Sequence, residues 1–464
     1  MCEIRIPQKA ETFKKFEKII ANQDPGRFNK RDIGLRLQTF LTAFTIVVCS
    51  MKNITLEGIA VQCQKLQYGL TLTKQALEKR LEAGQKELMT LLGVVTMTAV
   101  APALVNPKVA PIIEQFSAVN VTDATTISLP DKLFKKHKGL GGTNAKSAMK
   151  LQTTYDVKSK TYKKIAHIKN ATENDATYMD ELIKLINPGD LSIADLGYYG
   201  VIHFKRIVEK GAYFMSKIKS NTTLYTEDGQ QINLVSMLRG RYYLDTTVVI
   251  KGEGGKLSMP VRLCGVRLSD KSYNQRLYKA NKKAKSAGKT LSKEEKLRLK
   301  WILIISNVSA EMMNYHAVCE VYRIRWQIEL VFKSWKSHFA IDEMHNIGKH
   351  YLDCLLYGKL VVITVLTALH SYFHFHMLQI ADRGVSFLRF MNNMRENLDI
   401  FLGCITHSLP NCVIIIAIER IVSASLLEKR KRLTTEQCIY ELDIPRDVSA
   451  RCSESHVSTL GIVA

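Results

Sequence analysis

The stretch Tyr322-Arg-Ile-Arg-Trp-Gln-Ile-Glu-Leu-Val-Phe-Lys-Ser-Trp-Lys336 is the most informative part of the chain. On a helix, residues three, four or seven positions apart lie along one stripe. One such stripe consists of Tyr322, Arg325, Glu329 and Lys336. A second, apolar stripe would anchor the helix in a core: Ile324, Ile328, Val331 and Trp335. An acid flanked by two cations and a phenol suits a site that holds a metal and grips phosphate; a solvated face with salt bridges is the alternative.

The length and charge of the chain narrow the classes of partner. With 464 residues, two or three domains are expected, and a hydrophobic content of 46% is typical of a folded protein. The 66 Lys and Arg residues exceed the 43 Asp and Glu residues, which gives a net charge of +23. Such a surplus favours polyanions because binding releases their counterions. Nucleic acid is the first candidate partner and an anionic membrane surface the second.

Several sequence features argue against a membrane or secreted protein. Leu360–Leu369 is uncharged, but Lys359 and His370 flank it, and ten residues are too few to cross a bilayer. No apolar segment typical of a signal peptide follows the first residues. The ten cysteines include no Cys-x-x-Cys pair, so neither a zinc site nor a disulfide framework is indicated. We therefore expect reduced, mostly buried thiols and a cytoplasmic protein.

The first part of the chain, residues 1–112, reads as a helical DNA-binding domain. Apolar residues at helical spacing predict helices at Phe13–Ile20, Leu35–Met51 and Leu77–Leu92. Thr55–Gln64 and Gly69–Arg80 are typical of a helix-turn-helix, with a plain helical hairpin as the alternative. The second helix would be capped by Thr71 or Thr73. Its DNA-facing residues would be Lys74, Gln75, Lys79 and Arg80.

Residues 113–221 change to the alternating, β-branched pattern of strands. The predicted strands are Ala118–Leu129, Ala148–Val157, Thr161–Ile168, Leu191–Asp195 and Tyr213–Ile218. Helices are predicted at Asp175–Leu185 and Ile202–Lys210. Three strands, a helix, a strand and another helix before the last strand give a mixed α/β sheet of ribonuclease-H-like order.

Residues 222–306 predict a β-rich insertion with a basic segment. Tyr242–Ile250 and Val261–Leu268 alternate like strands, and Trp301–Ser306 reads as a buried strand. Between them, Lys271–Lys300 contains eleven Lys or Arg residues and only two acids, which favours phosphate tracking over an ordinary solvated face. Residues 307–384 would complete the core with the Glu-bearing helix, and 385–464 would form a helical C-terminal region that could support dimerisation.

Two further acids lie where a metal site would need them. Asp123 is in the middle of the first predicted strand, and Asp195 ends a central one. A carboxylate there is costly unless it is paired, hydrogen-bonded or bound to a cation. The alternatives are a turn-facing acid for Asp123 and a strand-end cap for Asp195. Together with Glu329, the two acids could hold two Mg²⁺ or Mn²⁺ ions for phosphodiester chemistry.

These residues resemble the DDE transposases of bacterial insertion sequences, in the insertion-sequence-4-type branch. The branch carries a Tyr-x2-Arg-x3-Glu-x6-Lys signature, which Tyr322, Arg325, Glu329 and Lys336 match in spacing. Asp123-Ala-Thr-Thr126 resembles the strand of the first acid, and Asp195 with Gly197-Tyr198 that of the second. The family also has a β-rich insert between its second Asp and its Glu. The resemblance covers roughly residues 1–380.

The resemblance implies a role for each matching residue. Asp123, Asp195 and Glu329 would be catalytic metal ligands for two Mg²⁺ (or Mn²⁺) ions. Phosphates of the transposon end would be contacted by Tyr322, Arg325, Lys333 and Lys336. Trp301 would stack on a flipped base, with a buried core tryptophan as the alternative. Trp326 also matches a family position, where packing could be its only role. Leu196 departs from the family, which often has a basic residue there.

The activity that the resemblance implies is cut-and-paste DNA transposition. A homodimer would pair double-stranded terminal inverted repeats, cut them, reopen a hairpin and join the ends to target DNA, in a nucleoid-associated bacterial protein without membrane contact. One alternative is a metal-dependent nuclease or a domesticated relative that does not integrate DNA. The other is a non-catalytic DNA-binding protein with structural acids.

Overall fold

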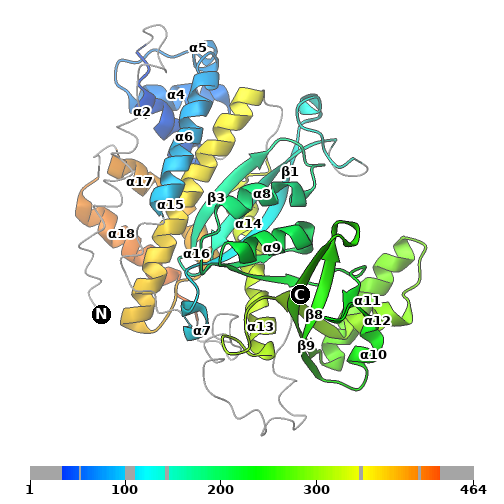
Figure 1. Cartoon of the computed structure of the whole chain (residues 1–464). Coiled ribbons are helices and arrows are strands. Elements are labelled where there is room, and N and C mark those ends of the chain that lie inside the picture. The colour runs from blue at the N-terminus through cyan, green and yellow to red at the C-terminus, as the bar shows by residue number, and fades with distance from the viewer. Residues whose placement is uncertain are drawn as a thin grey trace. The chain divides into compact units, whose positions relative to one another are not determined.

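The computed structural model describes residues 34–51, 54–99, 110–141, 146–343, 348–405 and 409–428. It is a mixed α/β structure (Figure 1). Its strands follow the hydrogen-bonded order β3-β2-β1-β4-β5-β10-β9-β8-β6-β7. The strands are β1 (Val119–Leu129), β2 (Ser147–Asp156), β3 (Thr161–Ile168), β4 (Leu191–Ala194), β5 (Tyr213–Lys217), β6 (Leu224–Tyr225), β7 (Gln231–Ile232), β8 (Tyr243–Gly252), β9 (Leu257–Arg267) and β10 (Trp301–Ser306). The mixed α/β class expected from the sequence is confirmed.

The chain divides into two compact units. Unit 1 consists of residues 1–108, 124–172 and 329–428, and unit 2 of 109–123, 173–328 and 429–464. The predicted helix at Phe13–Ile20 and the end of the C-terminal region, from residue 429 on, lie outside the described residues. The five ranges expected from the sequence remain a proposal about functional parts of the chain.

Unit 2 is built on parallel and antiparallel strand pairs. β1 pairs in parallel with β4, and β4 with β5, whereas β10 pairs antiparallel with both β5 and β9. The helices of this unit are α7 (Pro111–Glu114), α8 (Met179–Lys184), α9 (Val201–Glu209), α10 (Leu234–Leu238), α11 (Asp270–Ser286), α12 (Lys293–Leu299) and α13 (Tyr315–Val321). The basic segment Lys271–Lys300 thus forms two helices, which lie beside the β8–β9 hairpin in Figure 1.

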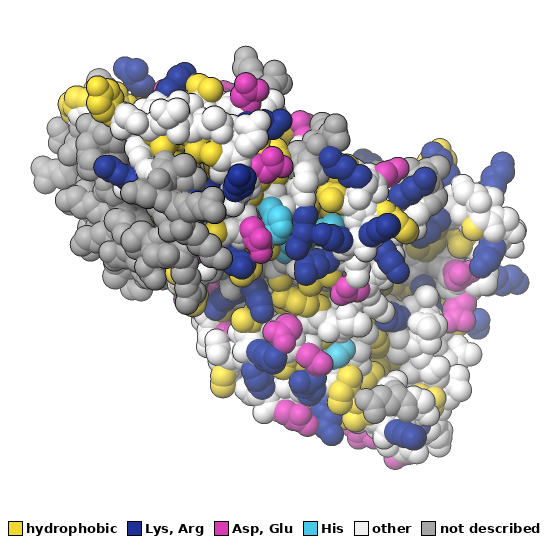
Figure 2. All heavy atoms as spheres, turned by 90° about the horizontal axis from the view of Figure 1, so that it is seen from above, with side chains coloured by type: hydrophobic (Ala, Val, Ile, Leu, Met, Phe, Trp, Pro, Cys, Tyr) yellow, Lys and Arg dark blue, Asp and Glu magenta, His cyan; other side chains and the backbone are white. Residues whose placement is uncertain are grey.

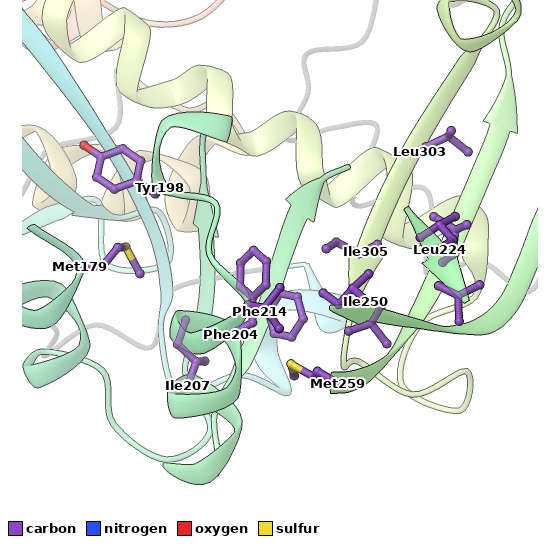
Figure 3. Packing of buried hydrophobic residues seen from close by; sticks show 14 of the residues in the cluster. Met179, Tyr198, Phe204, Ile207, Phe214, Leu224, Ile250, Met259, Leu303 and Ile305 are labelled. Atoms are coloured by element: carbon purple, nitrogen blue, oxygen red, sulfur yellow. The ribbon is translucent and has the colours of Figure 1, made fainter. Parts of the chain in front are cut away.

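The core of unit 2 joins α9 to the sheet. Phe204 of α9 stacks on Phe214 of β5 with ring centroids 4.4 Å apart, and Figure 3 shows Ile207 on the same side of the helix. Ile250 and Ile305 continue this packing through β8 and β10 (Figure 3). Because the apolar layer runs from α9 to the insertion strands, the predicted insertion shares one core with the strands before it.

Unit 1 combines helices with β2, β3 and the later residues of β1. Its helices are α2 (Leu37–Thr42), a π-helical turn (Ala43–Val47), α3 (Val48–Ser50), α4 (Leu56–Leu66), α5 (Lys74–Glu78), α6 (Leu81–Ala99), most of α14 (Trp326–Phe339), α15 (Lys349–Ala381), α16 (Phe387–Glu396), α17 (Leu398–Ile405) and α18 (Asn411–Ala424). α6 and α15 run side by side (Figure 1). Gly358 makes the close packing of α15 on the π-helical turn possible, since a Cβ there would come within 1.8 Å of the Phe44 carbonyl oxygen.

The prediction that the apolar segment around Leu360–Leu369 is too short to cross a membrane is wrong. The apolar stretch belongs to α15, a helix of 33 residues with a mean hydropathy of 1.9 in its most apolar window, which is long enough to cross a membrane. However, 89% of that window is buried inside the protein. The ammonium of Lys359 lies within this helix and donates to the Ala340 carbonyl oxygen at 2.8 Å, and burial lowers its pKa. Burial, and not length, therefore supports α15 as a core helix of unit 1.

The N-terminal helices agree only partly with the helix-turn-helix prediction. Thr55 caps α4 and Thr73 caps α5, each hydroxyl accepting a backbone N–H, so the second of the two expected caps is confirmed. However, α5 has only five residues, and Arg80 is buried with 9% of its surface exposed. The prediction that Arg80 faces DNA is therefore wrong. The predicted DNA-facing residues Lys74 and Lys79 are exposed.

The helix expected over 322–336 is not uniform. Tyr322–Arg325 form a 3₁₀ turn, and the regular α-helix begins at Trp326. The four polar residues therefore do not share one regular stripe, because a 3₁₀ turn rotates its side chains further per residue than an α-helix. The apolar stripe is confirmed: Ile324, Ile328, Val331 and Trp335 each expose 2% or less of their surface.

Candidate active site

Two acids meet at one end of the parallel pair β1–β4 in unit 2. The register places Thr122 of β1 opposite Ala194 of β4. Thr122 is followed by Asp123, and Ala194 is followed by Asp195. Parallel neighbours at the same level of a sheet lie about 4.8 Å apart. The side chain of Asp123 is 22% exposed and that of Asp195 is 46% exposed. The topology thus brings together two acids that the sequence separates by many residues, at a place open to solvent.

Arg325 makes ion pairs with both acids. Its Nη1 lies 3.2 Å from Oδ2 of Asp123, and its Nε lies 3.8 Å from Oδ1 of Asp195. The side chain of Arg325 is only 16% exposed, so its charge acts in a partly desolvated place where pairing matters more than at the surface. The resemblance implied that Arg325 contacts DNA phosphate; in the structure it is the counter-cation of the two acids.

Tyr322 supports the same place through the end of β4. Its side chain is buried, and the hydroxyl donates to the Ala194 carbonyl oxygen at 3.4 Å, next to Asp195. Burial raises the pKa of the Tyr322 phenol, so the group stays protonated and remains a donor. The ammonium of Lys217 lies 5.7 Å from the centre of the Tyr322 ring.

The remaining residues of the signature belong to unit 1. Glu329 lies in the first turn of α14 and is half-buried, whereas Lys333 is exposed. The ammonium of Lys336 donates to the carbonyl oxygen of Thr126 at 3.3 Å, so it contacts the strand segment that follows Asp123 in the chain. Within the described part of the chain, no three His, Cys, Asp or Glu side chains are close enough to form a ready metal site. The structure therefore brings two of the three acids together.

The two tryptophans differ in exposure. Trp301 is 3% exposed and belongs to the hydrophobic core of unit 2, which supports the core alternative over stacking on a flipped base. Trp326, one turn before Glu329, is 47% exposed. Nearly half of the Trp326 side chain is therefore accessible to a partner.

The structure adds basic residues that the sequence did not single out. Arg239, Arg241 and Arg267 line one pocket of unit 2 together with Lys300 and Trp301. A possible signal was the Arg-Gly-Arg turn at 239–241, directly before a predicted strand. Figure 2 shows Lys and Arg side chains spread over the visible face, with fewer Asp and Glu side chains among them.

The comparison with known families decides the class of the protein. Residues 114–365, more than half of the chain, match the family described as the transposase DDE domain. The chain belongs to this family. As an insertion-sequence transposase of the DDE class it is an enzyme that cleaves DNA and transfers strands, and the DDE domain implies dependence on a divalent metal.

Similar proteins carry consistent descriptions. The transposase is 27% identical over 339 residues to the transposase for insertion sequence element IS231F of Bacillus thuringiensis subsp. israelensis, covering 69% of this chain and 70% of that protein. It is 27% identical over 343 residues to the transposase for element IS1151 of Clostridium perfringens, covering 70% and 72%. Among solved structures, a piggyBac transposase synaptic complex with hairpin DNA has a TM-score of 0.44 and 10% identity, covering 92% of this chain and 87% of that one.

Proposed function

We propose that this transposase moves its element by cut and paste, cutting at terminal inverted repeats and joining the ends to target DNA. The observation that carries the proposal is the pair Asp123, within β1, and Asp195, directly after the parallel strand β4, which share the single positive charge of Arg325. Asp123, Asp195 and Glu329 would hold two Mg²⁺ (or Mn²⁺) ions. When bound, these ions activate a water or a 3′-hydroxyl and stabilise the leaving oxygen of the phosphodiester.

The donors of this site fit hard divalent cations. Carboxylate oxygens are the ligands that Mg²⁺ and Mn²⁺ prefer. Asp123 and Asp195 lie together and are reachable from solvent, and one guanidinium compensates part of their negative charge. Two carboxylates that attract the single positive charge of Arg325 attract a divalent cation more strongly.

The residues around the acids would then act on DNA. Once its acids have other cations, Arg325 would turn its guanidinium to a backbone phosphate, which it can bind through two parallel hydrogen bonds. Tyr322 would keep the end of β4 in place through its bond to Ala194. The exposed Lys333 and the half-buried Lys336 would add phosphate contacts.

The remaining parts of the proposal concern the fold and the assembly. We assign a ribonuclease-H-like core to β1–β5 with the helices that follow, interrupted before Glu329 by the segment from β6 to β10. The transposase would bind double-stranded DNA as a homodimer, without a membrane, at the bacterial nucleoid. The net charge of +23 supports such a polyanion partner. A hairpin intermediate is not part of the proposal, because Trp301 is buried.

The decisive experiment compares wild type with Glu329→Gln on a supercoiled plasmid. The plasmid would carry the inverted repeats that flank the coding region, and cleavage would be followed with and without Mg²⁺. We expect the variant to bind DNA normally and to lose Mg²⁺-dependent cleavage by about a thousandfold or more, because a metal ligand is lost. Glu209→Gln, which removes an exposed carboxylate on α9, is the matched control.

The same assay separates the alternative functions. Cleavage without strand-transfer products would favour a nuclease or a domesticated relative. DNA binding without any metal-dependent cleavage would identify a non-catalytic binder. Cleavage that is unchanged in Glu329→Gln would remove this residue from the mechanism.

A further inference from the structure

A pocket in unit 2, apart from the acids, is surrounded by positive charge. Its volume is about 300 Å³, and it lies where α10, α12, the end of β9 and the start of β10 meet. Its charged lining residues are all cations: Arg239, Arg241, Arg267, Lys293 and Lys300. Trp301 also lines it and is almost fully buried. Cations that converge on one hollow focus a positive potential there and attract an anion.

None of these five cations has an ion pair with any residue that the structure describes. Other cations of the same unit are paired: Arg262 binds Asp245 through two bonds of 2.7 Å, and Arg298 lies 2.9 Å from Glu294. The neighbouring acid Glu295 is also engaged, because it closes the capping box with Ser292 at the start of α12. The five cations of the pocket therefore keep their positive charge, whereas acids neutralise Arg262 and Arg298 nearby.

Aromatic rings hold two of the cations in place. The guanidinium of Arg267 lies 5.2 Å from the centre of the Tyr242 ring, and the ammonium of Lys300 lies 4.9 Å from that of Tyr273. A ring orients a cation without cancelling its charge, unlike a carboxylate. These two cations are thus positioned but still available to an anion.

The backbone around the pocket is also fixed. Arg267 and Trp301 are partners in the antiparallel pair of β9 and β10. Nη1 of Arg276 on α11 donates to the Trp301 carbonyl oxygen at 3.2 Å. The side chain of Trp301 packs in the core, so the wall from which the cations project is rigid. A prearranged set of cations loses little conformational entropy when an anion binds.

We propose that this pocket binds a backbone phosphate of DNA, at a place separate from the acids that cut it. The proposal rests on the proposed function for the identity of the polymer. The chemistry is that of a phosphodiester: a small, strongly charged group for which arginine provides paired N–H donors. The exposed ring of Tyr242 beside Arg267 can lie against the neighbouring sugar or base.

The test is the salt dependence of DNA binding, measured without divalent metal on a duplex of arbitrary sequence. We expect Arg241→Gln/Arg267→Gln to bind at least about tenfold more weakly at low salt. The slope of log K against log salt should become shallower by about one for each phosphate that the variant no longer neutralises. The matched control is Lys184→Gln/Lys205→Gln on α8 and α9, which removes the same charge from exposed positions outside the basic segment Lys271–Lys300 and should change affinity by less than about threefold.

Further variants keep the outcomes distinct. Arg241→Lys/Arg267→Lys keeps the charge but loses the paired N–H donors, so it should bind more tightly than Arg241→Gln/Arg267→Gln and more weakly than wild type. Circular dichroism would verify that each variant folds. Equal losses of affinity in the pocket and control variants would overturn the proposal, since general basicity would then explain binding. If inorganic phosphate raises the Tm of wild type but the pocket variant binds DNA like the control, the pocket takes free phosphate and the assignment to DNA fails. Since metal is absent, a failure of the proposed cleavage would leave this result unaffected.

Discussion

Two regions of unit 2 handle positive charge in opposite ways. Where the middle of β1 lies beside the end of β4, the single guanidinium of Arg325 is shared between Asp123 and Asp195. In the pocket beside β10, five cations have no acid partner among the described residues, and Tyr242 holds one of them by its ring. In the first region the acids form ion pairs with a cation. In the second region the cations have no such acid and are available to bind an anion.

The difference follows from the ligand proposed for each region, a metal ion for the acids and a phosphate for the pocket. A carboxylate pair that will bind metal is costly while it is empty, and a nearby arginine lowers that cost. A phosphate site has no such cost at the surface, because water solvates exposed cations well. The comparison suggests that cutting and gripping DNA are separate tasks in this protein, and the following predictions test that separation.

The largest effect is expected for Asp123→Asn. The amide keeps the size of the side chain but loses the charge that a divalent cation needs, so DNA cleavage should fall by about a thousandfold or more. Binding to DNA should change less than about twofold. Gel-based cleavage and binding assays would measure both, with Asp180→Asn as the control, because Asp180 is an exposed acid that pairs with Arg206 away from the site. Parallel losses of binding and cleavage would contradict the separation of the two tasks.

Next in size is the effect of Trp301→Ala on stability. Since Trp301 is 3% exposed, the truncation should lower the free energy of unfolding by about 3–5 kcal/mol through lost burial and a cavity. Trp326→Ala, which alters a residue that is 47% exposed, should cost about 1 kcal/mol or less. Chemical denaturation would measure both. Equal costs would mean that Trp301 is not the rigid wall of the pocket.

A smaller effect is expected when the shared guanidinium is removed. Arg325→Gln should bind Mn²⁺ on the order of tenfold more tightly in the absence of DNA, because the cation no longer competes with an arginine for Asp123 and Asp195. Isothermal titration calorimetry would measure the affinity. Arg206→Gln removes a surface cation paired with Asp180 and should leave it unchanged. Weaker Mn²⁺ binding by the Arg325 variant would show that the arginine assists the metal and does not stand in for it.

The smallest effect concerns the ring that positions Arg267. Tyr242→Ala should weaken DNA binding about two- to threefold, as expected for an exposed cation–π contact of about 0.5–1 kcal/mol. Tyr278→Ala on α11 is the control, since Tyr278 is as exposed as Tyr242 but lines no part of the pocket. Fluorescence anisotropy at low salt has the sensitivity for this difference. An unchanged affinity would show that Arg267 is held well enough without the ring.

Local patterns in the sequence predict most of the strands and the paired acids. The predicted strands Thr161–Ile168 and Trp301–Ser306 have the same bounds as β3 and β10, because β-branched and apolar residues there leave little choice of structure. Asp123 and Asp195 stand out because a carboxylate in or beside an apolar strand needs a partner. Their partner Arg325 is expected at the same site but in a different role, facing DNA.

Features that depend on distant contacts are not predictable from local patterns. The spacing of Tyr322 and Arg325 fits a 3₁₀ turn as well as an α-helix, so the sequence cannot distinguish them. Burial of Arg80 depends on how α6 packs, which the local pattern does not contain. The pocket joins Arg267 to Trp301 through the pairing of β9 with β10, two strands that are separated in the sequence by α11 and α12. Such a pairing becomes visible only in the folded chain.

The register between β1 and β4 has a consequence for how this enzyme can change over generations. Thr122 lies opposite Ala194, and each is followed by one of the two acids. Inserting or deleting a single residue within either strand would shift one carboxylate along by about 3.3 Å and turn it to the opposite face of the sheet. Copies with such a frame-preserving indel should still be expressed and still bind DNA, but they would be immobile elements. The length of these two strand segments is therefore constrained by the register that aligns the acids.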